Sequence, residues 1–197
     1  MGPAAIEVRL TAEQFLAWDA TQFLRHEFVA GEVSARAGAE DRHVTVTLNF
    51  YIALRQHLAG TPCKVFVSDM KLHVAAADAY FYPDVMVTCA DTDRASPLIK
   101  SEAVLVVEVL SASTAAYDRG AKFAAYRKLP SLQEFLVIDI DIDGRRADLH
   151  RKGADGLWVL HPFEPGDAVQ LRSVGLDLTA AQLFAEVDAR PSGAAPA

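Results

Sequence analysis

Short apolar runs alternate along this chain with stretches of helical spacing. Residues 103–110, AVLVVEVL, hold seven apolar residues in eight, and residues 134–140, EFLVIDI, have a similar pattern. Apolar runs of this length that are rich in valine are typical of strands buried on both faces. Residues 41–58 instead place Val44, Leu48 and Ile52 at helical spacing, which predicts the longest helix of the chain.

Turn and capping residues indicate the remaining elements. Thr11 and Gln14 have the spacing of a capping box, Ala30-Gly31 suits the turn of a hairpin, and Pro130 ends a helix. The other expected elements are a helix over 11–18, a hairpin over 25–36, strands over 63–69, 70–75 and 81–89, a polar loop over 90–102, a helix over 117–129, a hairpin over 145–163, a strand over 168–173 and a helix over 178–187. The pattern predicts an α/β (α+β) fold with strands clustered between residues 63 and 172.

The length and composition predict one soluble domain. The 197 residues are 51% hydrophobic and 23% charged, which is ordinary for globular proteins. We expect a single domain over residues 1–190 and a disordered tail over 191–197. No apolar run approaches the roughly 20 residues of a membrane span, and the start of the chain has no secretory pattern. Cys63 and Cys89 have no CxxC spacing, so we expect two buried, reduced thiols and a cytoplasmic protein.

The net charge limits how the chain could meet nucleic acid. It is −7 with a pI near 5.3, which argues against a protein that coats nucleic acid by bulk electrostatics. The same charge is compatible with an enzyme that gathers carboxylates around a metal ion.

One carboxylate stands in the apolar run 103–110. A buried glutamate such as Glu108 costs several kcal/mol unless it is paired, hydrogen-bonded or bound to a metal. Asp84 lies in an earlier predicted strand, and Asp118 and Lys122 are spaced i, i+4 in the helix that follows Glu108. Two carboxylates on neighbouring strands are able to share a hard divalent cation, and a lysine beside them is able to offset charge on a phosphate. These are the parts that metal-dependent phosphodiester hydrolysis needs.

Three stretches carry a family resemblance. YPDVMV at 82–87, LVVEVLSASTAAYDRGAKFAAYRKL at 105–129 and EFLVID at 134–139 resemble the Uma-two family of bacterial proteins in the PD-(D/E)XK superfamily of restriction-endonuclease-like nucleases. The resemblance implies a central mixed sheet flanked by helices. It also implies a site for Mg²⁺ or Mn²⁺ and a DNA substrate.

The resemblance assigns roles to individual residues. Asp84 matches the Asp of the motif and Glu108 its D/E position, and the backbone carbonyl of Val109 is a further expected metal ligand. Leu110 stands where the motif has lysine, and Lys122 in the next helix is the expected replacement. Two further positions, Glu27 and His43, match a recurrent Glu and His of the family and are expected to border the same cleft.

Simpler interpretations remain open for these residues. Glu108 is also explained by a buried ion pair that fastens the helix to the sheet, and Lys122 by a surface pair with Asp118. The densest basic cluster is either a solvated face or a DNA-phosphate contact. Its residues are Arg145, Arg146, Arg151 and Lys152.

Three functions follow from these alternatives. The first is a metal-dependent nuclease that acts on DNA, in which Asp84 and Glu108 bind the metal and Lys122 assists. The second is a catalytically inactive member of the fold that binds nucleic acid or another protein, and the missing lysine at position 110 motivates it. The third is a hydrolase of a small phosphoester. We also expect a homodimer.

Overall fold

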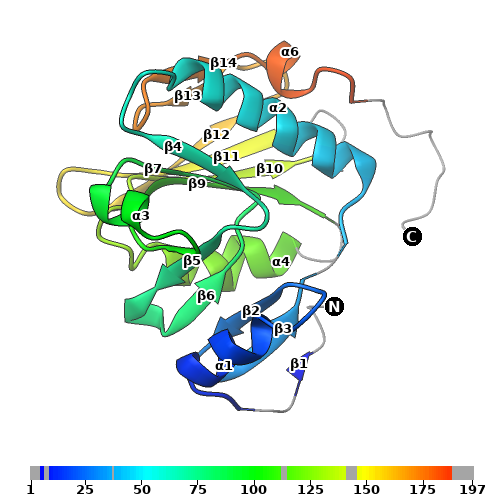
Figure 1. Cartoon of the computed structure of the whole chain (residues 1–197). Coiled ribbons are helices and arrows are strands. Elements are labelled where there is room, and N and C mark those ends of the chain that lie inside the picture. The colour runs from blue at the N-terminus through cyan, green and yellow to red at the C-terminus, as the bar shows by residue number, and fades with distance from the viewer. Residues whose placement is uncertain (1–4, 7–8, 37, 112–114, 141–145, 188–197) are drawn as a thin grey trace.

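The structure is a computed structural model that describes residues 5–6, 9–36, 38–111, 115–140 and 146–187 (Figure 1). Two sheets of six strands and a small two-stranded sheet form its framework. The main sheet has the spatial order β12 (Trp158–Phe163), β11 (Arg146–Lys152), β10 (Glu134–Asp139), β9 (Ala103–Leu110), β7 (Val85–Thr88) and β4 (Lys64–Val67). Among the described strands of the main sheet, only β9 and β10 pair in parallel. These two buried strands are the two apolar runs of the sequence.

The second sheet carries the N-terminal part of the chain. Its spatial order is β1 (Ala5–Ile6), β3 (Glu32–Ala35), β2 (His26–Val29), β6 (Ala79–Phe81), β5 (Lys71–Val74) and β8 (Ile99–Lys100). The predicted hairpin over 25–36 is confirmed as β2 and β3, which pair antiparallel. The third sheet pairs β13 (Val169–Leu171) with β14 (Leu176–Leu178).

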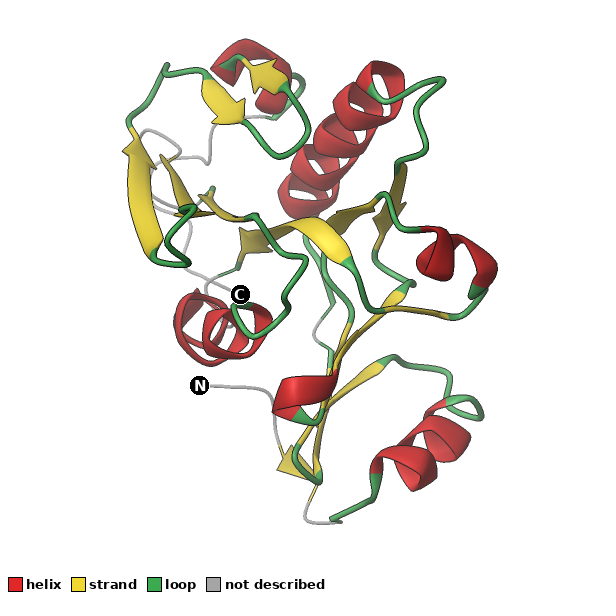
Figure 2. Cartoon of the chain, turned by 90° about the vertical axis from the view of Figure 1, so that its left-hand side faces the viewer, coloured by secondary structure: helices red, strands yellow, loops and turns green. Residues whose placement is uncertain are grey.

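Helices cover both faces of the main sheet. Figures 1 and 2 show α2 on one face and the helix that follows β9 on the other, while α1 lies against the second sheet. The helical segments are α1 (Ala12–Asp19), α2 (Asp41–His57), the 3₁₀ turn η1 (Ala75–Ala77), α3 (Asp91–Ala95), α4 (Ala115–Tyr117), the π-helical turn η2 (Asp118–Lys122), α5 (Phe123–Tyr126) and α6 (Ala180–Leu183). The Thr11–Gln14 capping box is present at the start of α1.

The alternation of side chains along β9 divides the core in two. Leu105, Val107 and Val109 pack toward α2, whereas Val106 and Leu110 pack toward α5 and the second sheet. Because side chains alternate along a strand, Glu108 points to the same side as Val106 and Leu110. The strand therefore delivers one carboxylate into the layer between the main sheet and the helix that follows it.

Helix α2 forms where the sequence predicts it but buries a different face. Its core residues are Val46, Phe50 and Leu54, each 0% exposed. The stripe that contains Val44 and Leu48 is about half exposed instead. Helical spacing of apolar residues indicated the element, but two apolar stripes share this helix and only packing selects between them.

The strand predicted over 81–89 is broken in the structure. β6 ends at Phe81 in the second sheet, and β7 begins at Val85 in the main sheet. Pro83 has no N–H to donate to a ladder, so the chain leaves one sheet and enters the other around it. Asp84 consequently lies at the junction of the two sheets.

Two further predicted elements differ from the structure. The 90–102 stretch, predicted to be a loop, contains α3 and β8. The helix predicted over 178–187 is limited to α6.

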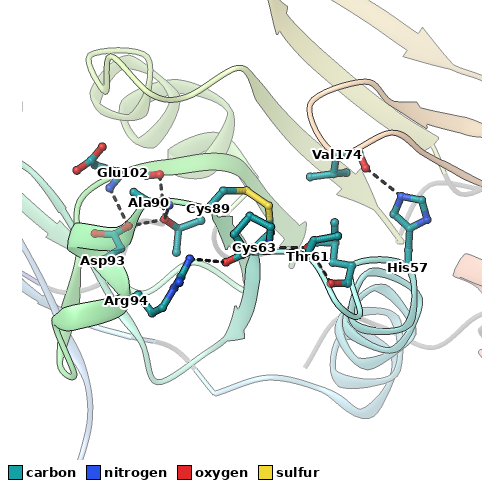
Figure 3. Close-up of a disulfide and its surroundings, with 12 residues drawn as sticks. His57, Thr61, Cys63, Cys89, Ala90, Asp93, Arg94, Glu102 and Val174 are labelled. Atoms are coloured by element: carbon teal, nitrogen blue, oxygen red, sulfur yellow. Dashed lines mark hydrogen bonds between the residues drawn. A yellow bond between two sulfur atoms is a disulfide. The ribbon is translucent and has the colours of Figure 1, made fainter.

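The prediction of two reduced thiols is wrong. Cys63 and Cys89 form a disulfide (Figure 3). The register of β4 and β7 pairs Lys64 with Thr88, and one step further along it sets the two cysteines opposite each other. Disulfides persist mainly in oxidising compartments, so the argument for a reducing cytoplasm that rested on free thiols fails. Among the described residues, no helix is both long and apolar enough to pass through a membrane.

We expect the disulfide to stabilise the fold by closing a loop of 26 residues in sequence. Reduction, or the double substitution Cys63→Ser with Cys89→Ser, should lower the free energy of unfolding by about 2–4 kcal/mol. Urea denaturation with and without dithiothreitol measures this, and the double variant is the control because its curve must not respond to the reductant. A wild-type curve that is unchanged by the reductant would contradict the expected bond.

Candidate active site

Strand register brings Asp84 and Glu108 together. β7 and β9 are antiparallel and pair Val85 with Val107, so the next position of the same register sets Asp84 opposite Glu108. Opposed residues of an antiparallel pair point to the same face. Both side chains are buried, with 3% of Asp84 and 2% of Glu108 exposed. Two like charges at such a position are destabilising unless other groups compensate them.

Asp84 is held by three groups. The Val109 backbone N–H donates to Oδ2 at 2.9 Å, His43 Nε2 lies 3.1 Å from the same oxygen, and the guanidinium of Arg36 pairs with Oδ1. Burial alone would raise the pKa of Asp84, but the hydrogen bond and charge of His43, with the charges of Arg36 and Lys122, hold that pKa below its ordinary value. Asp84 is therefore a carboxylate that stays ionised although it is buried.

Arg36 is a site residue that the sequence did not indicate. It follows β3 directly, and its Nη1 donates to the Ser68 carbonyl at 3.0 Å while its other nitrogen pairs with Asp84. Nothing in the local pattern separates Arg36 from other arginines near strand ends. Its role becomes visible only because the 26–35 hairpin packs beside the junction at Asp84.

Glu108 has a different set of partners. Its Oε1 accepts a hydrogen bond from the Tyr126 hydroxyl at 2.7 Å and lies 3.3 Å from Lys122 Nζ. Burial is the main reason that the pKa of Glu108 rises to about 8. Lys122 opposes that rise, and the neighbouring carboxylates of Asp84 and Asp118 add to it.

The ammonium of Lys122 is shared by three carboxylates. Its Nζ lies 3.0 Å from Glu27, 3.1 Å from Asp118 and 3.3 Å from Glu108. Burial disfavours a charged lysine, but these carboxylates hold the pKa of Lys122 well above its ordinary value. The side chain of Lys122 is only 8% exposed, so its pairing with Asp118 is a buried contact and the surface interpretation is wrong.

A π-helical turn faces this group of charges. Asp118 and Lys122 are the two ends of η2, and Tyr126 ends the α-helical turn after it. All three side chains are buried and meet Glu108 or each other. π-turns are uncommon and occur frequently at functional sites.

The site carries more negative than positive charge. Glu27, Asp84, Glu108 and Asp118 are four carboxylates, while Arg36 and Lys122 are the two permanent cations among them, and all six border the same cavity. The third permanent cation of the lining, Arg25, is 41% exposed and pairs with Asp69 instead. The cavity has a volume of about 410 Å³. A proton on Glu108 removes one of the two excess charges, and a divalent cation would remove both.

The oxygen donors fit a magnesium-type ion in chemistry and charge. Mg²⁺ is usually bound through one or two carboxylates and retains several waters, which matches Asp84 and Glu108 on one face. Within the described ranges no group of three or more His, Cys, Asp or Glu side chains is preformed for a metal. Val109 also borders the cavity, and its backbone carbonyl and water would be the remaining ligands. Arg36 would have to release the Oδ1 oxygen of Asp84.

The structure brings all five predicted catalytic residues to one cavity. Asp84, Glu108, Lys122, Glu27 and His43 come from five different segments and line it together, and Val109 lies beside them. The sequence did not indicate Arg36 or Tyr117, which also line it. Lys122 Nζ lies 5.8 Å from the centre of the Tyr117 ring.

The predicted basic cluster lies elsewhere. Arg146 and Arg151 are in β11, where Arg151 Nε pairs with buried Glu134 at 2.7 Å. Lys152 Nζ donates to the Pro130 carbonyl, and Arg146 is 3.5 Å from Glu164. Arg145 lies outside the described residues. None of the three described members lines the cavity, so a contact of this cluster with DNA stays a prediction.

Comparison with known protein families shows which family this chain belongs to. The family model "Uma2: Putative restriction endonuclease" matches residues 12–181, which include every described residue of the cavity. The chain belongs to the Uma2 family. The Uma2 match runs from the start of α1 to the first residues of α6, and it includes every strand of the two large sheets except β1.

Relatives and a solved structure agree with this assignment. The chain is 36% identical over 174 residues to "Uncharacterized protein slr1290" of Synechocystis, which covers 88% of this chain and 90% of that protein. It is also 36% identical to "Uncharacterized protein sll1609" of the same organism, over 77% of this chain and 85% of the relative. The crystal structure of "a putative nuclease belonging to DUF820" from Anabaena variabilis superimposes with a TM-score of 0.72 and 16% identity, over 89% of this chain and 97% of that one. The fold is therefore restriction-endonuclease-like, as the sequence predicted.

We expect Glu108→Gln to change how stability depends on pH. In the unfolded chain Glu108 releases its proton near its ordinary value of 4.5, whereas the folded protein retains that proton up to about pH 8. The folded state then binds more protons between these values, so stability falls as pH rises through this window, by at most about 1.4 kcal/mol per pH unit. Glutamine removes this contribution.

Denaturation in the presence of a chelator at about pH 5 to about pH 8 measures the effect. The free energy of unfolding of Glu108→Gln, relative to wild type, should increase steadily across this range. Parallel profiles for the two proteins would show that Glu108 does not retain its proton in the fold.

Proposed function

We propose that this protein is a metal-dependent nuclease that hydrolyses DNA phosphodiester bonds at the cavity. The observation that carries the proposal is the pair Asp84 and Glu108, opposed across two strands at a cavity where four carboxylates gather around Arg36 and Lys122. Membership of the Uma2 family and the nuclease fold support the same reaction class. Fold alone does not establish an activity, so the proposal depends on the site.

Asp84 and Glu108 hold Mg²⁺ or Mn²⁺ in this proposal, with the Val109 carbonyl. The bound ion supplies stabilisation of the negative charge that develops on the phosphate. The hydrogen bond from His43 and the Val109 N–H keep Asp84 Oδ2 in a fixed orientation. Tyr126 does the same for Glu108 Oε1. Positioned carboxylates of this kind keep the metal-binding geometry without reorganisation during the reaction.

Two cations remain for the phosphate. Arg36 would be able to pair with a phosphate oxygen through its planar fork of donors, if it gave up its contact with Asp84. Lys122 stands in for the lysine that Leu110 replaces, and its Nζ positions the attacking water or offsets charge on the phosphate. Glu27 and Asp118 keep Lys122 protonated and so keep it a donor.

A binding module without catalysis is the second candidate. It is favoured by the close pairing of Arg36 with Asp84, which occupies one proposed metal ligand. In this case the carboxylates serve to fasten the helix after β9 to the sheet. Substitution of the site would then change stability but no reaction.

We expect metal-dependent cleavage of labelled single- or double-stranded DNA with Mg²⁺ or Mn²⁺. Asp84→Asn, Glu108→Gln and Lys122→Met should each lower the rate by about 100-fold or more, since each removes a ligand or a charge that acts on the phosphate. Gel or fluorescence assays with and without EDTA measure this.

Two substitutions outside the cavity are matched controls. Glu134→Gln changes a glutamate on the neighbouring strand that is 1% exposed, and Lys100→Met changes a lysine that is 3% exposed. Neither lines the cavity, so folded samples of both should retain cleavage. Absence of cleavage on all substrates, together with metal-independent stability, would favour the binding module.

The expected homodimer is kept as part of the proposal. β12 is an edge strand of the main sheet, and Val159 and Leu160 on it are about half exposed. Edge strands with exposed apolar side chains are ready to pair with another chain. Light scattering should give twice the mass of one chain, and a single-chain mass at working concentration would refute the dimer.

A further inference from the structure

The entrance of the cavity is apolar although its floor is charged. Phe23 and Leu24, in the segment between α1 and β2, are 105% and 64% exposed, and Val44 and Leu48 on α2 are 43% and 46% exposed. All four line the cavity. They are four of the nine large apolar side chains that are exposed in the described part of the chain. This concentration at one opening marks a surface that binds something.

The carboxylates lie below this rim. Asp84 and Glu108 are almost inaccessible at 3% and 2% exposure, so a phosphate reaches them only by entering the cavity. The volume of about 410 Å³ falls in the range of about 300–1,000 Å³ that small-ligand sites have. One nucleotide unit fits such a space, whereas the stacked and paired bases of an intact duplex do not enter it.

The arrangement of charge matches one unpaired nucleotide. Arg36 and Lys122 at the floor suit a phosphate, and the flat ring of Phe23 at the rim suits the face of a base. Enzymes that act in enclosed pockets on nucleic acid take an unpaired or extruded nucleotide, because atoms inside a duplex cannot reach the pocket. Arg25, whose side chain is 41% exposed, also borders the opening and adds positive charge near the path of the backbone.

We propose that the cavity accepts an unpaired nucleotide, so that the substrate is single-stranded nucleic acid or a frayed strand end, and that Phe23 stacks on the base beside the scissile phosphate. This inference rests on the proposed nuclease function and deepens it. Leu24, Val44 and Leu48 complete an apolar collar that excludes water around the base. Stacking of this kind tolerates any base, so little sequence preference is expected at this position.

The test compares one oligonucleotide sequence in single-stranded and blunt duplex form, as DNA and as RNA, in Mn²⁺. Wild type should cleave the single strand at least about 10-fold faster than the duplex, and the DNA and RNA arms identify which sugar is accepted. Phe23→Ala should lower kcat/KM for the single strand by about 10-fold, mainly through KM, because a base–aromatic contact is lost. Phe23→Trp should retain the wild-type rate, since tryptophan also stacks.

A matched control and a binding readout accompany the kinetics. Leu98→Ala removes an apolar side chain that is 75% exposed and does not line the cavity, so it should leave kcat/KM unchanged. Fluorescence anisotropy of a labelled single strand, measured on Glu108→Gln with and without Phe23→Ala, should show about 10-fold weaker binding when Phe23 is absent. In Phe23→Trp, indole fluorescence should be quenched on binding.

The outcomes separate the two proposals. Metal-dependent cleavage that is equal or faster on the duplex would overturn the unpaired-nucleotide inference and leave the nuclease proposal intact. Absence of cleavage would refute the nuclease, while a loss of single-strand binding in Phe23→Ala would still support the base contact. Unchanged single-strand binding in Phe23→Ala would overturn that contact. Light scattering gives the last outcome. If Phe23→Ala converted a dimer to a monomer and left the single-strand kinetics unchanged, the collar would be an interface between copies, and the base contact would be overturned.

Discussion

The buried ammonium of Lys122 is the contact on which the site and much of the fold depend. It joins Glu27 from the second sheet, Glu108 from the main sheet and Asp118 from its own helical segment. The three segments meet in a dry layer, where an unpaired charge would cost several kcal/mol. The same ammonium that joins the two sheets and the helix thus also borders the cavity of the proposed chemistry. Removal of one partner leaves the others uncompensated, which is why substitutions here are expected to affect folding as well as activity.

The charge surplus around this lysine gives the site its chemical character. Four carboxylates surround Arg36 and Lys122 at one cavity, while Arg25 at its opening pairs with Asp69. The burial of Glu108 raises its pKa to about 8. A group in this state keeps its proton at a pH where an exposed glutamate has lost it. Asp84 differs because His43 and Arg36 keep it ionised. Two opposed carboxylates therefore have distinct roles, one permanently charged and one that responds to its surroundings.

Two contacts join the residues around Asp84 to neighbouring strands: the ion pair of Arg36 and the disulfide. Arg36 compensates the charge of Asp84 and also bonds the Ser68 carbonyl, so it joins the site to the turn after β4. The disulfide fastens β4, the edge of the main sheet, to β7, the strand that begins directly after Asp84. In this way the edge of the sheet that borders the cavity is covalently restrained. Of the apolar collar, Phe23 and Leu24 belong to the segment between α1 and β2, whereas Val44 and Leu48 belong to α2.

The sequence by itself determined most of the elements and singled out Asp84, Glu108 and Lys122, and the family resemblance added Glu27 and His43. Valine-rich runs, a capping box and turn residues are local signals, and they predicted β9, β10, the two hairpins, α1 and α2. Glu108 was recognisable because a charge inside an apolar run needs a partner.

The tertiary structure decided which residues are buried, which strands pair and which distant side chains meet. Packing selected Val46, Phe50 and Leu54 as the buried face of α2 and left Val44 and Leu48 exposed beside the cavity. Strand order placed β6 and β7 in different sheets, and the hairpin of β2 and β3 brought Arg36 to Asp84. The Cys63–Cys89 bond also depends on the pairing of β4 with β7. These features join residues that are far apart in the chain. The free energy of such contacts depends on how strands pair and on which segment packs alongside, and a short stretch of sequence contains neither kind of information.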